Sequence, residues 1–319
     1  MTVLRVLVAG TPAVALPSLE MLANDARFEV VAVLTNPDRP RGRSARPVPS
    51  PVAERALALG IPVIRPERPR DAVEAIVATG ADIGAVVAYG SILPRQVLDA
   101  LPLGFVNLHF SLLPRWRGAA PVQHAIRAGD PVTGVTAFRL DEGMDTGPIL
   151  RAVAVTPPDD VDAGDLLDAL AERGAPVLAD ALIAVRAGEV GTAQPTEGVS
   201  LAPRIRPEDT VVDWGRPAEE VARMVRSVTP RPGATTSVDG TRLKVAVARP
   251  ASGLARSADG VPGTVLGTDG DSVLVACGDG AVLIGRVQPE GRPWSTAADQ
   301  VRGRRIDVGT VLGAGRATT

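Results

Sequence analysis

An amide and an imidazole stand two residues apart, at Asn107 and His109, where an apolar run ends. Residues two apart on a β-strand project to the same side, so both side chains would face one site. Open α/β sheets bind ligands at the carboxyl ends of their strands. An amide and an imidazole placed there can polarise a carbonyl and stabilise an oxyanion. The pair therefore predicts carbonyl chemistry, with a hydrogen-bonded pair at a strand end as the alternative.

A second polar cluster, residues 141–148, follows a predicted strand that ends at Leu140, so we expect it at a carboxyl end as well. Glycines on both sides of Asp145 would let this loop fold back toward His109. A carboxylate beside the histidine would raise its pKa and fix its orientation. It could also receive a proton from an attacking amine. Asp145 is therefore the candidate carboxylate, and an ordinary Asp-Gly turn is the alternative.

Several other kinds of site are disfavoured. The turn at Gly10 lacks the other two glycines of a dinucleotide-binding loop, and Pro12 has no N–H to offer a phosphate. No phosphate-binding loop of the ATP-binding type occurs. Cys277 is the single cysteine, which excludes a thiolate zinc site and an intrachain disulfide. We therefore expect a reaction without a metal.

The first half of the chain alternates apolar strand patterns with helix patterns. Continuous apolar strands separated by helices indicate a mainly parallel sheet covered on both faces, a Rossmann-like α/β domain. We expect strands at residues 3–9, 30–35, 83–88, 106–109 and 135–140, and helices ending near Asn24 and spanning residues 51–59 and 121–128.

The pattern changes near residue 190. Residues 189–207 are rich in Gly, Pro, Thr and Glu, which is typical of a linker, and a helix is expected at residues 216–228. Asp-Gly pairs at Gly240, Gly270 and Gly280 then predict hairpins between short strands. Such strands are typical of a small β-barrel, here OB-like. The predicted organisation is a catalytic domain at residues 1–188, a linker at 189–207 and a barrel at 208–319.

Composition gives few clues to partners. The formal net charge of −2 carries no signal for nucleic acid, and only 3% of residues are aromatic, which argues against a base-stacking platform. Lys244 is the only lysine among 34 basic residues, most simply a bias of a GC-rich genome. Neither a signal peptide nor a 20-residue apolar run is evident. We expect a cytoplasmic monomer that does not associate with membranes.

Residues 111–121, Ser-Leu-Leu-Pro-Arg-Trp-Arg-Gly-Ala-Ala-Pro, resemble the signature of the methionyl-tRNA formyltransferases. Asn107, His109 and Asp145 are similar to the catalytic trio of the wider folate-dependent formyltransferase family. Shorter matches follow in family order over nearly the whole chain: residues 9–12, 37–40, 50–52, 87–90 and 213–214.

The resemblance implies a reaction. The donor is 10-formyltetrahydrofolate, the acceptor is the amine of methionyl initiator tRNA, and no metal takes part. Asn107 and His109 would stabilise the tetrahedral oxyanion, and Asp145 would orient His109 or relay protons with it. The pocket for the folate would be lined by Ser111, Leu112, Leu113 and Pro114, and the C-terminal barrel would contact the tRNA.

The resemblance also bears on tRNA contacts. It implies that a basic loop with Arg39, Arg41, Arg43 and Arg46 enters the acceptor end, with Arg43 as the best match. Arg204 stands where the family commonly has Lys, which keeps the charge for a phosphate contact.

Phe110 departs from the pattern, because the family usually has a small residue between His and Ser. A ring at this position could crowd the folate or tilt His109.

Two alternatives remain at this point. The chain could be another folate-dependent enzyme, such as a sugar-amine formyltransferase or a formyltetrahydrofolate hydrolase. It could also be a non-catalytic RNA-binding protein, which turnover of a folate donor would exclude.

Overall fold

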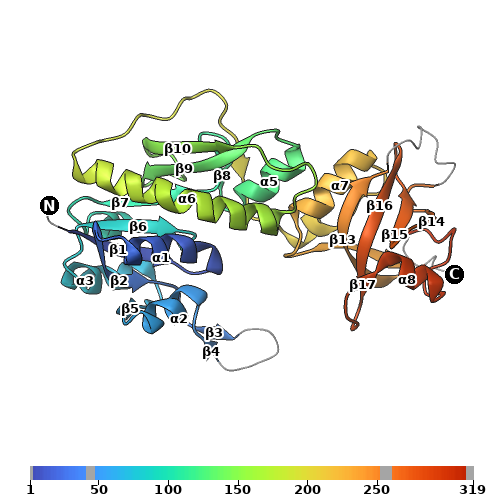
Figure 1. The fold of residues 1–319 in the computed structure, drawn as a ribbon, viewed down its shortest axis with the longest axis horizontal. Helices are drawn as coiled ribbons and strands as arrows, with labels where there is room; N and C mark the ends of the chain where they lie inside the picture. Colours follow the sequence, from blue (N-terminus) through green and yellow to red (C-terminus); the bar gives the residue numbers. More distant parts are fainter. Residues whose placement is uncertain (1–2, 41–46, 252–260, 314–319) are drawn as a thin grey trace. The chain divides into compact units, whose positions relative to one another are not determined.

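The structure is a computed structural model that describes residues 3–40, 47–251 and 261–313 (Figure 1). Its contacts divide the chain into two compact units, and neither is one continuous segment. The first unit continues past the predicted boundary at residue 188 to Pro203. Unit 1 comprises Met1–Pro121, Val132–Thr156 and Leu167–Pro203, and unit 2 comprises Val122–Pro131, Pro157–Leu166 and Arg204–Thr319.

Unit 1 contains a seven-stranded sheet in the order β10-β9-β7-β6-β1-β2-β5 (Figure 1). Strands β1, β2, β5, β6 and β7 run parallel, whereas β9 is antiparallel to both of its neighbours, β7 and β10. The predicted mainly parallel sheet is therefore confirmed. The strands are β1 (Leu4–Gly10), β2 (Phe28–Leu34), β5 (Val63–Ile64), β6 (Ile83–Val87), β7 (Phe105–His109), β9 (Thr133–Arg139) and β10 (Ile149–Val155).

Helices cover both faces of this sheet. On one face, Phe105 of β7 shares a buried core with Ile76 and Val97, which come from α3 (Val73–Ala78) and α4 (Arg95–Leu98). On the other face lies the long helix α6 (Ala163–Arg186), which runs along the sheet in Figure 1. A Cβ added to its Gly174 would come 2.7 Å from a methyl carbon of Leu108 on β7. Backbone alternation then places Asn107 and His109 on the Phe105 side of β7.

The local sequence explains where helix α2 begins and ends. Helix α2 (Pro51–Ala58) begins where predicted, with Pro51 in its first turn and the Ser50 hydroxyl accepting a hydrogen bond from Ala53 N at 3.0 Å. Gly60, at φ +72°, follows its end. The other short elements of unit 1 and its borders are α1 (Leu16–Asn24), α5 (Pro121–Ala128), β3 (Arg39–Pro40), β4 (Pro47–Val48), β8 (Arg117–Gly118) and β11 (Leu201–Ala202).

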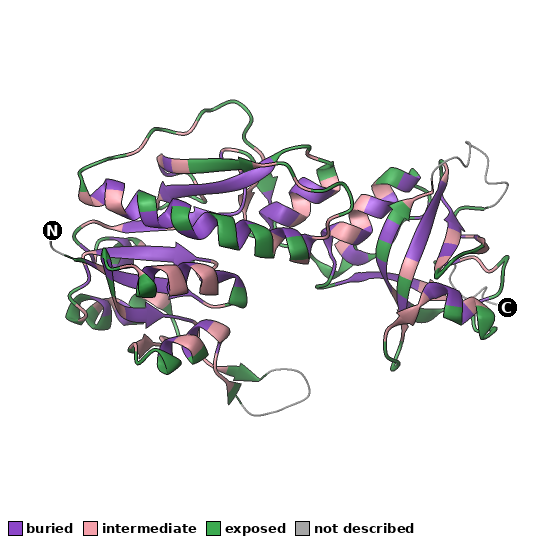
Figure 2. Cartoon of the chain, viewed as in Figure 1, coloured by how far each residue is buried: buried purple, intermediate pink, exposed green. Residues whose placement is uncertain are grey.

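Unit 2 is an antiparallel β domain with its own core. Its main strands pair in the order β12-β13-β16-β15-β14, and β17 (Ser295–Thr296) pairs with β16. Hairpins join β12 to β13, β14 to β15 and β15 to β16 at the predicted Asp-Gly turns. Buried residues of these strands form one hydrophobic core that includes Trp214, whose ring N–H donates to Thr236 Oγ1 at 3.0 Å. Figure 2 shows buried stretches along the strands of this domain. The elements are α7 (Ala218–Ser227), β12 (Ala234–Val238), β13 (Thr241–Pro250), β14 (Val265–Asp269), β15 (Ser272–Ala276), β16 (Ala281–Pro289) and α8 (Ala297–Arg302).

Within the described ranges, no helix has both the length and the apolar character needed to cross a membrane.

Candidate active site

The imidazole of His109 is enclosed at the end of β7. The residue is 5% exposed, and its ring meets the Phe138 ring edge to face at a centroid distance of 6.5 Å. Its Nε2 lies 2.8 Å from the carbonyl oxygen of Trp116. A carbonyl oxygen only accepts, so Nε2 carries a proton and Nδ1 is the nitrogen left for chemistry.

Asp145 faces that nitrogen. One carboxylate oxygen, Oδ2, lies 3.7 Å from His109 Nδ1 and accepts a hydrogen bond from Gly118 N at 2.7 Å. The backbone of Asp145 is left-handed, at φ 54°, a conformation that non-glycine residues seldom adopt. The structure therefore brings His109 and Asp145 together, and Asn107 projects from the same side of β7.

The Asp145 loop reaches this place by a different route from the one expected. Because β9 is antiparallel to β7, Arg139 at the end of β9 pairs with Val106 near the start of β7. The loop therefore begins beside the start of β7, at the end of the sheet opposite His109, and must fold back toward His109. Gly147 allows the return, because a Cβ there would clash with the Arg139 carbonyl oxygen.

Burial controls the protonation of His109. Desolvation lowers the pKa of the imidazole below its ordinary value of 6.5, while the Asp145 charge and the Trp116 carbonyl act in the opposite direction. The ring is therefore neutral at pH 7, and its Nδ1 can accept a proton next to a carboxylate. Asn107 is partly exposed, and no side-chain hydrogen bond of this residue is found in the described part of the chain. Its amide is available to donate to an oxyanion.

The segment predicted to line a folate pocket is held by hydrogen bonds within its own turn and to β9. The Ser111 hydroxyl is buried and donates to Arg115 O at 2.6 Å, and Leu113 N donates to Thr136 Oγ1 at 3.1 Å. Leu112 and Pro114 are the two partly exposed members of the four. We propose that these two contact the folate.

Phe110 is 6% exposed and is counted among the buried hydrophobic residues of unit 1. The ring that contacts His109 is Phe138. Burial favours a packing role for Phe110 over one in a ligand pocket.

A cavity of about 470 Å³ lies beside the Asp145 loop in unit 1. Residues of α4, the start of β7 and the end of β9 line it, and none of Ser111, Leu112, Leu113 and Pro114 is among them. Its charged lining residues are Arg95, Asp99, Arg139, Asp141 and Glu142.

Gln194 is a residue that the sequence did not single out. Its side chain bonds to the backbone of the Asp145 loop on one side and to the Arg117 guanidinium on the other. It lies in the Gly- and Pro-rich stretch that the sequence predicts as a linker, where nothing in the local pattern distinguishes it.

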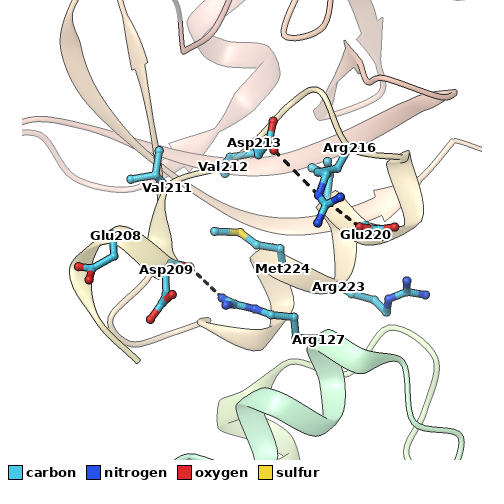
Figure 3. Close-up of a pocket in the computed structure, with 11 residues that line it drawn as sticks. Arg127, Glu208, Asp209, Val211, Val212, Asp213, Arg216, Glu220, Arg223 and Met224 are labelled. Atoms are coloured by element: carbon cyan, nitrogen blue, oxygen red, sulfur yellow. Dashed lines mark hydrogen bonds and ion pairs between the residues drawn. The ribbon is translucent and has the colours of Figure 1, made fainter. Parts of the chain in front are cut away.

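Unit 2 has a cleft of about 310 Å³ that contains none of the catalytic candidates (Figure 3). Arg216 lies between Asp213 and Glu220 at 4.0 and 3.5 Å, and Arg127 donates to Asp209 O. Three arginines and four carboxylate residues line it, so their charges largely cancel. This balance gives no preference for an anion or a cation.

Only some of the residues predicted to contact tRNA lie within the described part of the chain. Arg204 is exposed, whereas Arg43, Arg41 and Arg46 lie outside the described residues. Arg39 is exposed on β3. No cluster of three or more potential metal-binding side chains occurs among the residues that the structure describes.

Comparisons with known proteins cover nearly the whole chain. Residues 4–182 match the family described as formyl transferase, and residues 204–305 match its C-terminal domain. A methionyl-tRNA formyltransferase of Arthrobacter sp. (strain FB24) is 48% identical over 313 residues, 97% of this chain and 100% of that protein. One from Streptomyces coelicolor is 47% identical over 313 residues, again 97% and 100%.

Solved structures share the fold at low identity. HypX from Aquifex aeolicus in complex with tetrahydrofolic acid has a TM-score of 0.67 and 17% identity, covering 97% of this chain and 48% of that one. The sugar 3N-formyl transferase WlaRD has a TM-score of 0.66 and 17% identity, and the match covers 92% of this chain and 100% of that one. At these identities the likeness concerns the fold alone.

Proposed function

The chain belongs to the formyl transferase family, among the methionyl-tRNA formyltransferases, and we propose on this premise that it formylates methionyl initiator tRNA with 10-formyltetrahydrofolate. The observation that carries the proposal is the approach of His109 Nδ1 to Asp145 Oδ2, at 3.7 Å, in a chain that matches a methionyl-tRNA formyltransferase over 97% of its length. The activity requires a group that accepts a proton from an amine, and this pair provides one.

The residues divide the work as follows. The methionyl amine attacks the formyl carbon, and the carbonyl electrons move to oxygen, where the Asn107 amide N–H stabilises the charge. His109 Nδ1 accepts the proton that the amine loses, and the Asp145 carboxylate stabilises the resulting imidazolium. The bond from the formyl carbon to the folate nitrogen then breaks, and His109 returns the proton to that nitrogen. Because Nε2–H is already bonded to Trp116 O, the oxyanion role falls to Asn107 more than to His109.

The test is formylation of methionyl initiator tRNA with 10-formyltetrahydrofolate and no added metal. Formyl-methionyl-tRNA and tetrahydrofolate should form together. Equal consumption of the donor with and without tRNA would identify a hydrolase instead. Binding of tRNA with no turnover would indicate a non-catalytic RNA-binding protein.

We predict that the acid limb of the pH profile of kcat/KM lies below pH 6.5. Burial lowers the pKa of His109, so the neutral form that accepts a proton persists to lower pH than in a free imidazole. Activity should fall only as the pH drops through this lowered pKa. Asp145→Asn removes the charge that raises the pKa of His109, so the acid limb of the variant's residual activity should lie at still lower pH. A wild-type limb above pH 6.5 would contradict a neutral, buried His109.

The tRNA contacts give a separate prediction. If Arg43 and Arg204 bind phosphates, Arg43→Ala and Arg204→Ala should each weaken tRNA binding and reduce its salt slope by roughly one. Arg204→Lys should keep most of the binding, since the charge is retained. Arg68→Ala is the control, because Arg68 is exposed and pairs with Asp71 at 3.0 Å. Unchanged salt slopes in both alanine variants would remove these residues from tRNA binding.

We also propose that the protein acts as a monomer in the cytoplasm, where its proposed tRNA substrate is used. Residues 208–319 would form the domain that contacts the tRNA. Light scattering during size-exclusion chromatography tests the oligomeric state.

A further inference from the structure

We propose that Gln194 and Arg117 act as one positioning unit that holds the Asp145 loop in its reactive geometry. This inference rests on the proposed function, and it assigns a role to two side chains that act on His109 only through the Asp145 loop. Gln194 lies between α6 and β11, and Arg117 lies on β8.

Gln194 uses its whole amide group. Its Nε2 donates to the carbonyl oxygens of Asp145 and Gly147, both at 2.8 Å. Its Oε1 accepts two hydrogen bonds from Arg117, from Nε at 3.1 Å and from Nη2 at 2.6 Å. Two N–H donors and two lone pairs are all that a glutamine amide offers, so every one is used.

The Asp145 loop needs such support. Residues 141–144 and Thr146 are exposed, so little packing fixes the loop. Asp145 is held at φ 54°, a left-handed conformation that is strained for a non-glycine residue. The bonds from Gln194 bracket this residue, at its own carbonyl and at that of Gly147. They therefore oppose the relaxation that would move the carboxylate away from His109.

Arg117 connects this support to the other contact of the carboxylate. The next residue along β8, Gly118, gives its backbone N–H to Asp145 Oδ2 at 2.7 Å. Strand β8 thus holds the carboxylate through Gly118 and the loop backbone through Arg117 and Gln194.

The segment that carries Gln194 is itself anchored in unit 1. Thr192 exchanges two backbone hydrogen bonds with Ile149, each at 2.8 Å. Further on, Leu201 and Ala202 pair with β8. Part of the predicted linker is therefore a structural support of the active site, and we propose that the catalytic domain extends to Pro203.

The decisive variant is Gln194→Glu. A carboxylate can still accept from Arg117, but it cannot donate to Asp145 O and Gly147 O and would repel them. We expect kcat for formylation to fall by about ten- to a hundredfold, since small displacements of catalytic groups have effects of this order. KM for both substrates should change by less than about threefold, because Gln194 has no role in substrate binding in this proposal.

Two further measurements distinguish positioning from general stability. Moving Asp145 away removes a charge that raises the pKa of His109, so the acid limb of the profile should shift to lower pH. Arg117→Ala and Gln194→Ala should also be strongly non-additive in kcat, because either change disables the same unit. Asn24→Asp is a matched control, since it removes a similar amide bond to a backbone carbonyl, Glu20 O at 2.8 Å. It should leave both kcat and the pH profile unchanged.

Gln194→Met covers the case in which the glutamate variant does not fold. It has a similar length and no charge, and it should show the same loss of kcat and the same pH shift. Wild-type kcat and pH profile in a folded Gln194→Met or Gln194→Glu variant would overturn the inference. Absence of formylation by the wild type would overturn the proposed function instead.

Discussion

We expect Asn107→Ala, His109→Ala and Asp145→Ala each to lower the rate of formyl transfer by about two to three orders of magnitude. The loss of one oxyanion donor has an effect of this size, and so does the loss of a positioned proton acceptor. Rates should be measured in single turnovers at saturating tRNA and folate, with circular dichroism to show that each variant folds. Saturation ensures that the loss reflects the chemical step and not substrate affinity.

Asp145→Asn is the informative companion to these variants. Its side-chain oxygen can still accept from Gly118 N, which now bonds to Oδ2 at 2.7 Å, so the loop should stay in place without its charge. A loss as large as that of Asp145→Ala would show that the charge beside His109 matters. Near-normal rates for a folded His109→Ala or Asp145→Ala would end the assignment of this site.

Gly147→Ala should be nearly as damaging, by about a hundredfold in kcat, although this residue has no reactive group. An added Cβ would clash with the carbonyl oxygen of Arg139, a backbone atom that cannot rotate away. The loop would have to move outward and take Asp145 with it, and a displacement of about 1 Å can cost this much. The measurement is kcat together with the thermal midpoint, because the clash should also reduce stability.

Gly215→Ala is the control for that substitution. The nearest atom to an added Cβ there is Oδ1 of Asp213, 3.1 Å away at the end of a movable side chain. Activity equal to wild type in Gly147→Ala would mean that the loop tolerates movement, which would also weaken the role assigned to Gln194.

Local signals predicted much of the fold. Pro51 and Gly60 predict where a helix begins and ends, and Asp-Gly pairs predict where hairpins turn, and these elements lie where predicted. Strand β10 and helix α6 were not predicted. Three residues of β10 in succession are exposed, so it lacks the continuous apolar run of a buried strand. Helix α6 contains Pro176 and Gly174, residues that ordinarily weaken a helix, and tertiary packing outweighs them.

The candidate site was predictable only in part. The spacing of Asn107 and His109 predicts that their side chains project from the same side of the strand, and the glycines around Asp145 predict a sharply turning loop. Strand direction is a property of the whole sheet. The sequence therefore could not show that β9 is antiparallel to β7 and that the loop begins beside the start of β7. The role of Gln194 could not be predicted for a related reason, because the backbone carbonyls to which it donates lie 47 and 49 residues away in the sequence.

The interrupted path of unit 1 has a consequence for synthesis on the ribosome. The catalytic candidates are translated by residue 145, yet the support for their loop is made about 50 residues later, at Gln194. At about 5–20 residues per second, the nascent chain spends several seconds with the trio present and its carboxylate loop unsupported. During this interval β8 also lacks β11, the strand with which it pairs in the complete protein. A nascent chain halted at residue 188 would therefore carry all three catalytic candidates and still lack the segment that we propose holds the Asp145 loop in place.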